Sequence, residues 1–228
     1  SRWLTMCAEQ GEMDVYRVAV AIVAAFICEL VDASLGMGFG TTLTPILLAL
    51  GFEPVEIVPA VLLAQAVSGT VAGVFHHGYG NIHLGRGSRD RTIAVVLTIF
   101  GVVGIVASVS LAVRLPAWAV RLYIGLLVFS LGIAILLNRR RELHFSWGRI
   151  AALGFVAAFN KGISGGGYGP VVTSGQVMAG VRGRTAVGIG TLTEGITAVV
   201  GVLIYVVLGV GIPWRTALPL TLGALLSV

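Results

Sequence analysis

Long apolar runs, separated by short polar segments, dominate the pattern of residues along the chain. Four runs are long enough for a helix to cross the apolar core of a bilayer, which takes about 20 residues. These four runs cover residues 54–74, 93–113, 117–137 and 186–208. Two other runs, at 41–50 and 171–181, are too short to cross, because a ten-residue helix is only about 15 Å long. The pattern predicts an all-α membrane protein, a multi-pass helical bundle in which short helices accompany spanning ones.

Each short run follows a glycine-rich motif that interrupts the preceding apolar run. The first motif is DASLGMGFG at residues 32–40, which directly follows the run 18–31. The second motif is NKGISGGGYG at residues 160–169, which follows the run 150–159. Glycine adopts positive φ without strain, so each motif is expected to end one helix and begin another. We therefore expect a broken helical hairpin at each motif.

The charges between the runs distinguish two ways of threading these segments through a membrane. If each short run joined the next long run as one broken span, the segments GFEPVE (51–56) and GVRGR (180–184) would lie at mid-membrane. That position costs several kcal/mol per charge. If each short run instead turns back as a re-entrant hairpin, the arginine-bearing loops at 83–91, 138–149 and 180–184 all lie on the cytoplasmic side. We favour the hairpin arrangement for this reason.

The two halves of the chain align without a gap at a shift of 129 residues. The matched positions include the glycines Gly36, Gly38 and Gly40 on Gly165, Gly167 and Gly169, and the polar pair Gln65 on Glu194. A hairpin plus three spans is an odd number of crossings. The halves are therefore expected to have opposite orientations in the membrane, as in transporters built from inverted repeats.

These halves define the expected domain organisation. We expect a single transmembrane domain over residues 1–228, with repeat one at 15–137 and repeat two at 147–228. About seven membrane segments are expected in a chain of this length. The last apolar run, which begins at Ile212, is still apolar where the sequence stops, so an eighth segment is expected to be missing and the second repeat to be incomplete. The start, SRWLTMCAEQGEMD, has no initiator Met, so we also expect processing or trimming there.

Composition supports the membrane assignment and limits the classes of partner. The chain is 57% hydrophobic and 11% charged, with a mean hydropathy of +0.97, whereas soluble domains carry about 25% charged residues. The net charge of +5 comes largely from arginines in short loops, which indicates topology and gives no argument for nucleic-acid binding. We expect a multi-pass protein of the plasma or inner cell membrane, with the lipid bilayer as its surroundings and no nucleic-acid partner.

The paired motifs resemble those of the sulfite exporter TauE/SafE family of membrane permeases. The resemblance rests on SLGMGFGTTLTPILLALG and GISGGGYGPVVTSGQVMAG, followed by the long helices AVLLAQAVSGTVAGV and AVGIGTLTEGITAVV, and covers residues 18–208. The sequence departs from the usual pattern at GMGFG, where a denser glycine run is common, and by lacking an A-T-S signature in the long helices. The resemblance implies a two-fold repeat and the export or uptake of sulfite, sulfonates or related sulfur-containing anions.

The hairpin tips are the expected substrate site. A helix N-terminus offers free N–H groups and a partial positive charge to an anion, and two such ends from opposite faces would converge near the midplane. Six glycines are expected to bring backbone close to the substrate: Gly36, Gly38, Gly40, Gly165, Gly166 and Gly167. Four hydroxyl groups are candidate donors, although each alone is more often a contact between helices: Ser34, Thr41, Ser164 and Thr191.

Lys161 lies immediately before the second glycine motif. A lysine within a membrane span is costly unless it faces a cavity or an acid. One interpretation is a counter-charge for the anion, with Asn160 as a neutral donor. The alternative is a structural ion pair with Asp32, which is its counterpart in the first half, or with Glu29.

Glu194 lies in the middle of a long apolar run, and a carboxylate within the membrane is a functional candidate. We expect it to couple transport to protons; the alternative is a buried acid that holds helices together. Gln65 is its neutral counterpart and a possible donor to the anion. Glu29 and Asp32 share a helix face at i,i+3 spacing, so they are further proton-coupling candidates, with salt bridging or capping as the alternative.

These features predict a secondary transporter, most simply an exporter, of a small sulfur-containing anion such as sulfite or an organosulfonate. A passive anion channel and a non-transporting membrane protein are the alternatives. The chain shows no arrangement of nucleophile and base, no metal-ligand cluster and no phosphate-binding loop. We therefore expect no enzymatic activity, no cofactor, no metal and no ATP drive within this chain, and we leave a homo-oligomer open.

Overall fold

The computed structural model describes residues 15–36, 38–137 and 144–228. The first fourteen residues, Met37 of the first glycine motif and residues 138–143 lie outside this description. The expectations for the start of the chain, and for the first half of the arginine-rich loop at 138–149, therefore fall outside the described residues.

The described residues form helices joined by short loops and contain no strand, which confirms the predicted all-α class. The helices are α2 Val15–Leu35, α3 Phe39–Ala49, α4 Pro54–Gly78, α5 Arg89–Ala112, α6 Ala117–Leu137, α7 Trp147–Ser164, α8 Tyr168–Met178, α9 Gly183–Val207 and α10 Trp214–Leu225. Local sequence explains several of these boundaries. The α4 helix begins at a proline behind a capping box of Glu53 and Glu56, and Ser88 caps α5 by accepting from the Arg91 N–H.

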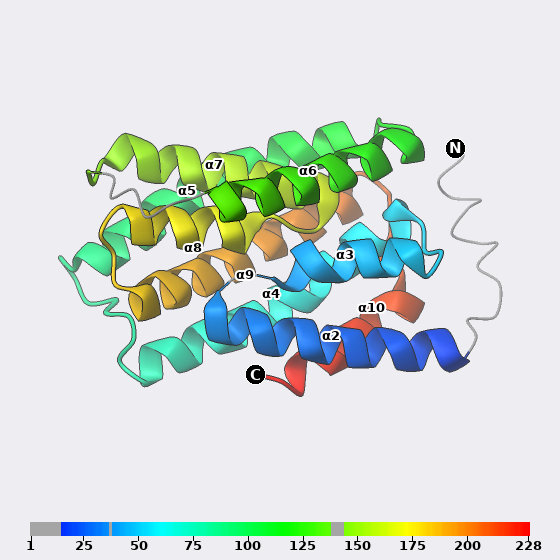
Figure 1. The fold of residues 1–228 in the computed structure, drawn as a ribbon, viewed down its shortest axis with the longest axis horizontal. Coiled ribbons are helices and arrows are strands. Elements are labelled where there is room, and N and C mark those ends of the chain that lie inside the picture. The colour runs from blue at the N-terminus through cyan, green and yellow to red at the C-terminus, as the bar shows by residue number, and fades with distance from the viewer. Residues whose placement is uncertain (1–14, 37, 138–143) are drawn as a thin grey trace.

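The helices run along the long axis of the molecule, and their loops gather at its two ends (Figure 1). The loops after α4 and α8 lie at one end, and the loops after α3, α5 and α9 lie at the other. The short helices α3 and α8 turn back beside α2 and α7. Glu53 consequently lies at an end of the bundle, where its carboxylate pairs with Arg121 and remains partly exposed. GFEPVE therefore does not lie in the middle of the bundle.

Five of the described helices are long and apolar enough to cross a membrane: α2, α4, α5, α6 and α9. Their burial differs widely. The apolar windows of α4 and α9 are 72% and 67% buried, whereas that of α6 is 11% buried. The α4 and α9 helices therefore form the centre of the bundle. The outer helices present large apolar side chains such as Ile99 and Phe129 outward, as expected of a surface that faces lipid.

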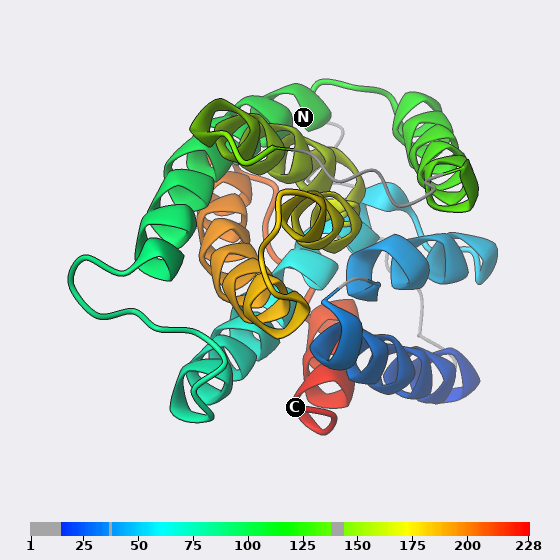
Figure 2. The ribbon, with the colours of Figure 1, turned by 60° about the vertical axis from the view of Figure 1, so that its left-hand side comes forward.

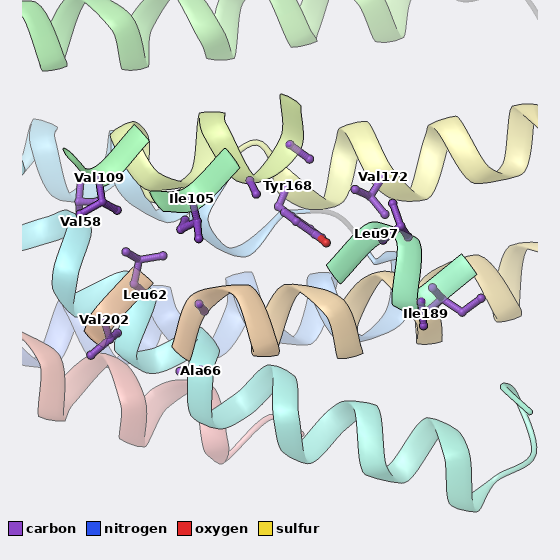
Figure 3. Close-up of a cluster of buried hydrophobic side chains, with 14 of the residues drawn as sticks. Val58, Leu62, Ala66, Leu97, Ile105, Val109, Tyr168, Val172, Ile189 and Val202 are labelled. Atoms are coloured by element: carbon purple, nitrogen blue, oxygen red, sulfur yellow. The ribbon is translucent and has the colours of Figure 1, made fainter. Parts of the chain in front are cut away.

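The largest hydrophobic cluster surrounds α9, which packs against α4, α5 and α8 (Figure 2). Leu62 of α4, Leu97 and Ile105 of α5 and Val172 of α8 belong to it (Figure 3). Tyr168 at the start of α8 is fully buried in the same cluster and points toward α9 (Figure 3). This packing fixes the position of the second glycine motif, because Tyr168 belongs to that motif.

Helix boundaries repeat along the chain with the shift found in the sequence. The α3 helix covers 39–49 and α8 covers 168–178, so both ends differ by 129 residues. The α4 and α9 helices, at 54–78 and 183–207, differ by the same 129 residues at both ends. The two halves of the chain therefore share the order of long helix, glycine motif, short helix and long helix.

Candidate functional site

The two glycine motifs meet in the interior of the bundle. The backbone of Gly40 lies against that of Gly165 and Gly166 so closely that a Cβ on Gly40 would collide with the Gly165 carbonyl group. Two hydrogen bonds join the halves at this point. The Gly167 N–H donates to Thr41 Oγ1 at 2.9 Å, and Thr173 Oγ1 donates to the Gly36 carbonyl at 2.8 Å. We call this contact the crossing; it joins Gly36 and residues 38–41 of the first half to residues 165–167 and Thr173 of the second half.

Glycine is required at the crossing by backbone conformation as well as by space. Gly165 ends α7 in the left-handed region with a φ of 73°, and Gly167 precedes α8 with a φ of 84°. A side chain at either position would be strained. The expected break between two helices at each motif is therefore present, and it places the N-termini of α3 and α8 at the crossing.

Lys161, Gln65 and Glu194 form a hydrogen-bonded group beside the crossing. Lys161 Nζ donates to Glu194 Oε1 at 2.8 Å, and Gln65 Nε2 donates to the same oxygen at 2.7 Å. Lys161 Nζ also donates to Gln65 Oε1. The three side chains come from α7, α4 and α9, and each is at least 95% buried. The two residues matched by the sequence repeat, Gln65 and Glu194, are thus bonded directly to each other.

This group corrects the sequence hypothesis for the ion pair of Lys161. Its acidic partner is Glu194, not Asp32 or Glu29, because α9 packs beside α7 at this level. Lys161 Nζ also lies 5.8 Å from the centre of the Tyr168 ring, within the range of a cation–π contact. An acid, an amide and an aromatic ring therefore hold this ammonium group away from lipid.

Asn160 and Ser164, on either side of Lys161 in sequence, are tied into the local structure. The Tyr123 hydroxyl of α6 donates a hydrogen bond to Asn160 Oδ1 at 2.6 Å. This bond uses the amide oxygen of Asn160 and not its N–H groups. The Ser164 hydroxyl donates to the Asn160 carbonyl and accepts from the Gly166 N–H at 3.1 Å. Ser164 therefore shapes the turn between α7 and α8.

Glu29 and Asp32 of α2 are buried near the same group. Their relative exposures are 1% and 5%, and both lie within electrostatic range of Lys161 and Glu194. The Asp32 carboxyl faces the backbone N–H of Phe39, at the start of α3. A carboxylate of the protein itself therefore faces the helix N-terminus in the first half. Lys161 takes the equivalent position in the second half.

Several buried hydroxyl groups near the crossing have no hydrogen-bond partner. They are those of Thr44, Ser68 and Thr191, each at most 4% exposed. Thr44 lies beside Gly165 at the crossing. Ser68 and Thr191 each lie one helical turn from a member of the Lys161 group, Gln65 and Glu194 respectively. Buried polar groups are nearly always bonded, so these hydroxyls are available to a polar ligand.

A cavity of about 530 Å³ leads from the arginine-bearing end of the bundle toward the crossing. Its lining includes Ser34, His76, Thr173 and Arg184. Ser34 is exposed there and donates its hydroxyl to the Leu30 carbonyl at 2.7 Å, so it lies outside the crossing itself. Thr173 connects the two regions, because it lines the cavity and bonds the carbonyl of Gly36. No group of three or more side chains able to hold a metal occurs among the described residues.

Sequence reasoning missed some residues of the site. Tyr168 and Thr44 matched Phe39 and Thr173 in the repeat, but carried no predicted role. Their signal was the repeat itself, since Phe39 matches Tyr168 and Thr44 matches Thr173 beside the two glycine motifs. Tyr123 had no comparable signal, because its contact with Asn160 depends on how α6 packs.

Comparison with known proteins shows which protein family the chain is related to. The family model described as sulfite exporter TauE/SafE matches residues 21–228, which confirms the resemblance seen in the paired motifs. Over 164 residues the chain is 32% identical to the "Probable membrane transporter protein YtnM" of Bacillus subtilis (strain 168). The match covers 67% of this chain and 52% of that protein, so the chain spans about half the length of this relative. No solved structure matches the chain.

Proposed function

The chain belongs to the sulfite exporter TauE/SafE family, and from this premise we propose that it is a secondary transporter of a small sulfur-containing anion. It is a multi-pass membrane protein, as its family and its five apolar helices indicate. Sulfite or a simple organosulfonate is the proposed substrate, and export the proposed direction. The relative in Bacillus subtilis, whose printed name is that of a probable membrane transporter, supports transport as the activity.

The observation that carries this proposal is the fully buried Lys161 beside two glycine turns. A cation inside apolar helices is expensive to maintain, and such residues mark ion and substrate paths in membrane proteins. Here the ammonium group lies beside two helix N-termini, which attract anions. The unpartnered hydroxyls of Thr44, Ser68 and Thr191 add neutral donors. An oxyanion needs this combination of one cation and several converging donors.

The anion is proposed to bind at the crossing by competing with Glu194 for Lys161. The tip glycines Gly40, Gly165, Gly166 and Gly167 allow the backbone to approach it, and Thr41, Ser164 and Asn160 position the turn. Gly36, Gly38 and Ser34 line its path from the cavity at the arginine-bearing end. Gln65 and Thr191 support the group from α4 and α9.

Two repeats of opposite orientation are proposed to provide access from both sides. Each repeat contributes one re-entrant hairpin, α2–α3 in repeat one and α7–α8 in repeat two, over 15–137 and 147–228. The repeated helix boundaries support this division. Rocking of one repeat against the other would expose the crossing to each side in turn. The arginine-bearing end is then the cytoplasmic one, by the positive-inside rule.

A passive anion channel is the second candidate, because an anion site that is reached from a cavity could serve either mechanism. The tight backbone contact at the crossing favours a transporter. The closely packed turns at Gly40 and Gly165 must separate before an anion can pass between them. A channel would need a continuous path.

Flux of radiolabelled sulfite into proteoliposomes tests the proposed function. The wild-type protein is expected to give a saturable flux. A Lys161→Gln and Glu194→Gln double variant keeps the charge balance but removes the cation, so it is expected to lose at least nine-tenths of that flux. Arg149→Gln, at an exposed arginine at the start of α7, is the matched control and should transport normally. Flux that never saturates, or that survives in the double variant, would contradict the proposal.

A further inference from the structure

The buried charges beside the crossing do not balance. Among the described residues, four acidic or basic side chains are buried: Glu29, Asp32, Lys161 and Glu194. Glu194 is paired with Lys161, so the carboxyl groups of Glu29 and Asp32 have no basic partner within this set. An unpaired buried charge costs several kcal/mol. A positive charge bound at one of these two carboxyl groups would remove part of this cost.

The surroundings of the two carboxyl groups distinguish them. Asp32 faces the Phe39 N–H at the start of α3, where the partial positive charge of a helix N-terminus stabilises a carboxylate. Glu29 is 1% exposed and its Oε2 has no hydrogen-bond partner. The Ser68 hydroxyl from α4, fully buried, lies beside Glu29 and also has no partner. Glu29 and Ser68 are thus two adjacent polar groups, and each lacks a bond that the other could make.

We propose that Glu29 is the site at which this protein binds a proton during transport, with Ser68 as its hydrogen-bond acceptor. The proton comes from bulk water and forms an O–H bond at Oε2, and this O–H then donates to Ser68 Oγ. A bond between Glu29 and Ser68 satisfies both atoms in either protonation state, but only the protonated form also removes a buried charge. A metal cation would need several converging oxygen ligands, and the described residues contain no metal-holding group.

The proton site is coupled to the anion site by charge, and this inference rests on the proposed function. Glu29 faces Lys161 from α7 and Glu194 from α9, with Asp32 on its own helix. An anion that binds Lys161 brings negative charge close to Glu29 and so disfavours the ionised carboxylate. Anion binding therefore raises the affinity for the proton, and proton binding raises the affinity for the anion by the same factor. The result is movement of one proton together with the anion in the same direction.

Proton uptake on anion binding provides the test. The probe is methanesulfonate, because its charge does not titrate near neutral pH, whereas sulfite itself exchanges protons there. A pH-indicator dye in weakly buffered detergent solution reports uptake, and radiolabelled methanesulfonate reports binding. We expect the wild-type protein to take up a proton with each anion bound. Glu29→Gln is expected to bind methanesulfonate and to lose at least nine-tenths of the uptake, while Asp90→Asn at the arginine-bearing end keeps it.

A second variant keeps the test decisive if Glu29→Gln does not fold. Ser68→Ala removes the hydroxyl beside the carboxyl group but retains Glu29, so proton uptake is expected to persist with a changed pH profile. Undiminished uptake in Glu29→Gln, or uptake with an unchanged pH profile in Ser68→Ala, would overturn the proposal. Anion binding that depends on sodium without proton uptake would overturn it as well. Failure of the wild-type protein to bind either sulfite or methanesulfonate would instead contradict the proposed function.

Discussion

At the scale of single residues, the surroundings of Lys161 explain how a lysine is kept inside apolar helices. Its ammonium group donates to Glu194 and Gln65 and lies over the ring of Tyr168. The sequence predicted Lys161, Gln65 and Glu194 among its candidate polar site residues. It could not pair them, because the pairing depends on the rotation and depth of three different helices. From the sequence, Asp32 or Glu29 was the alternative ion-pair partner for Lys161, whereas the structure pairs Lys161 with Glu194.

Stability measurements on the ion pair follow from this arrangement. Lys161→Gln alone leaves a buried carboxylate without its cation, and Glu194→Gln alone leaves a buried cation without its acid. Each is expected to destabilise the protein by about 3–5 kcal/mol. The double variant should recover most of this loss, since two neutral amides can still hydrogen-bond. Denaturation in detergent checks this, and additive losses in the double variant would show that the pair is not coupled.

At the scale of elements, the two hairpins follow closely from the sequence. The apolar runs at 41–50 and 171–181 correspond to α3 at 39–49 and α8 at 168–178. Glycines with positive φ mark the breaks, as the motifs predicted. The contact between the two tips was expected from the repeat, but its atoms were not, because backbone-to-backbone packing leaves no periodic pattern of side chains.

Gly40→Ala tests whether this contact holds the hairpins together. A methyl group at Gly40 would collide with the backbone of Gly165 and Gly166, and overpacking of this kind typically costs about 1–3 kcal/mol. Gly78→Ala is the matched control, since that glycine is also helical and has open space around it. We expect a lower melting temperature and weaker sulfite binding in Gly40→Ala alone. Equal behaviour of the two variants would mean that the crossing tolerates separation.

At the scale of the whole molecule, charge and apolar surface define an axis. Arg89 and Arg182 lie around a charged pocket at one end, whereas the Glu53–Arg121 pair lies at the other. Apolar side chains cover the outside between these ends, and the polar groups gather at the centre. Hydropathy and loop charges predicted this arrangement of charged ends and apolar sides, because a protein inserted in a bilayer needs apolar spans and charged loops.

We propose that an anion crosses the membrane by alternate exposure of a single site at the crossing to the two sides. Counterflow tests this most directly: proteoliposomes are loaded with unlabelled sulfite and diluted into a trace of labelled sulfite. A transporter exchanges one anion for another, so the account predicts a transient accumulation of label inside the vesicles, absent from the Lys161→Gln and Glu194→Gln double variant. Label that merely equilibrates at the same rate with or without preloading would contradict the account and indicate a channel.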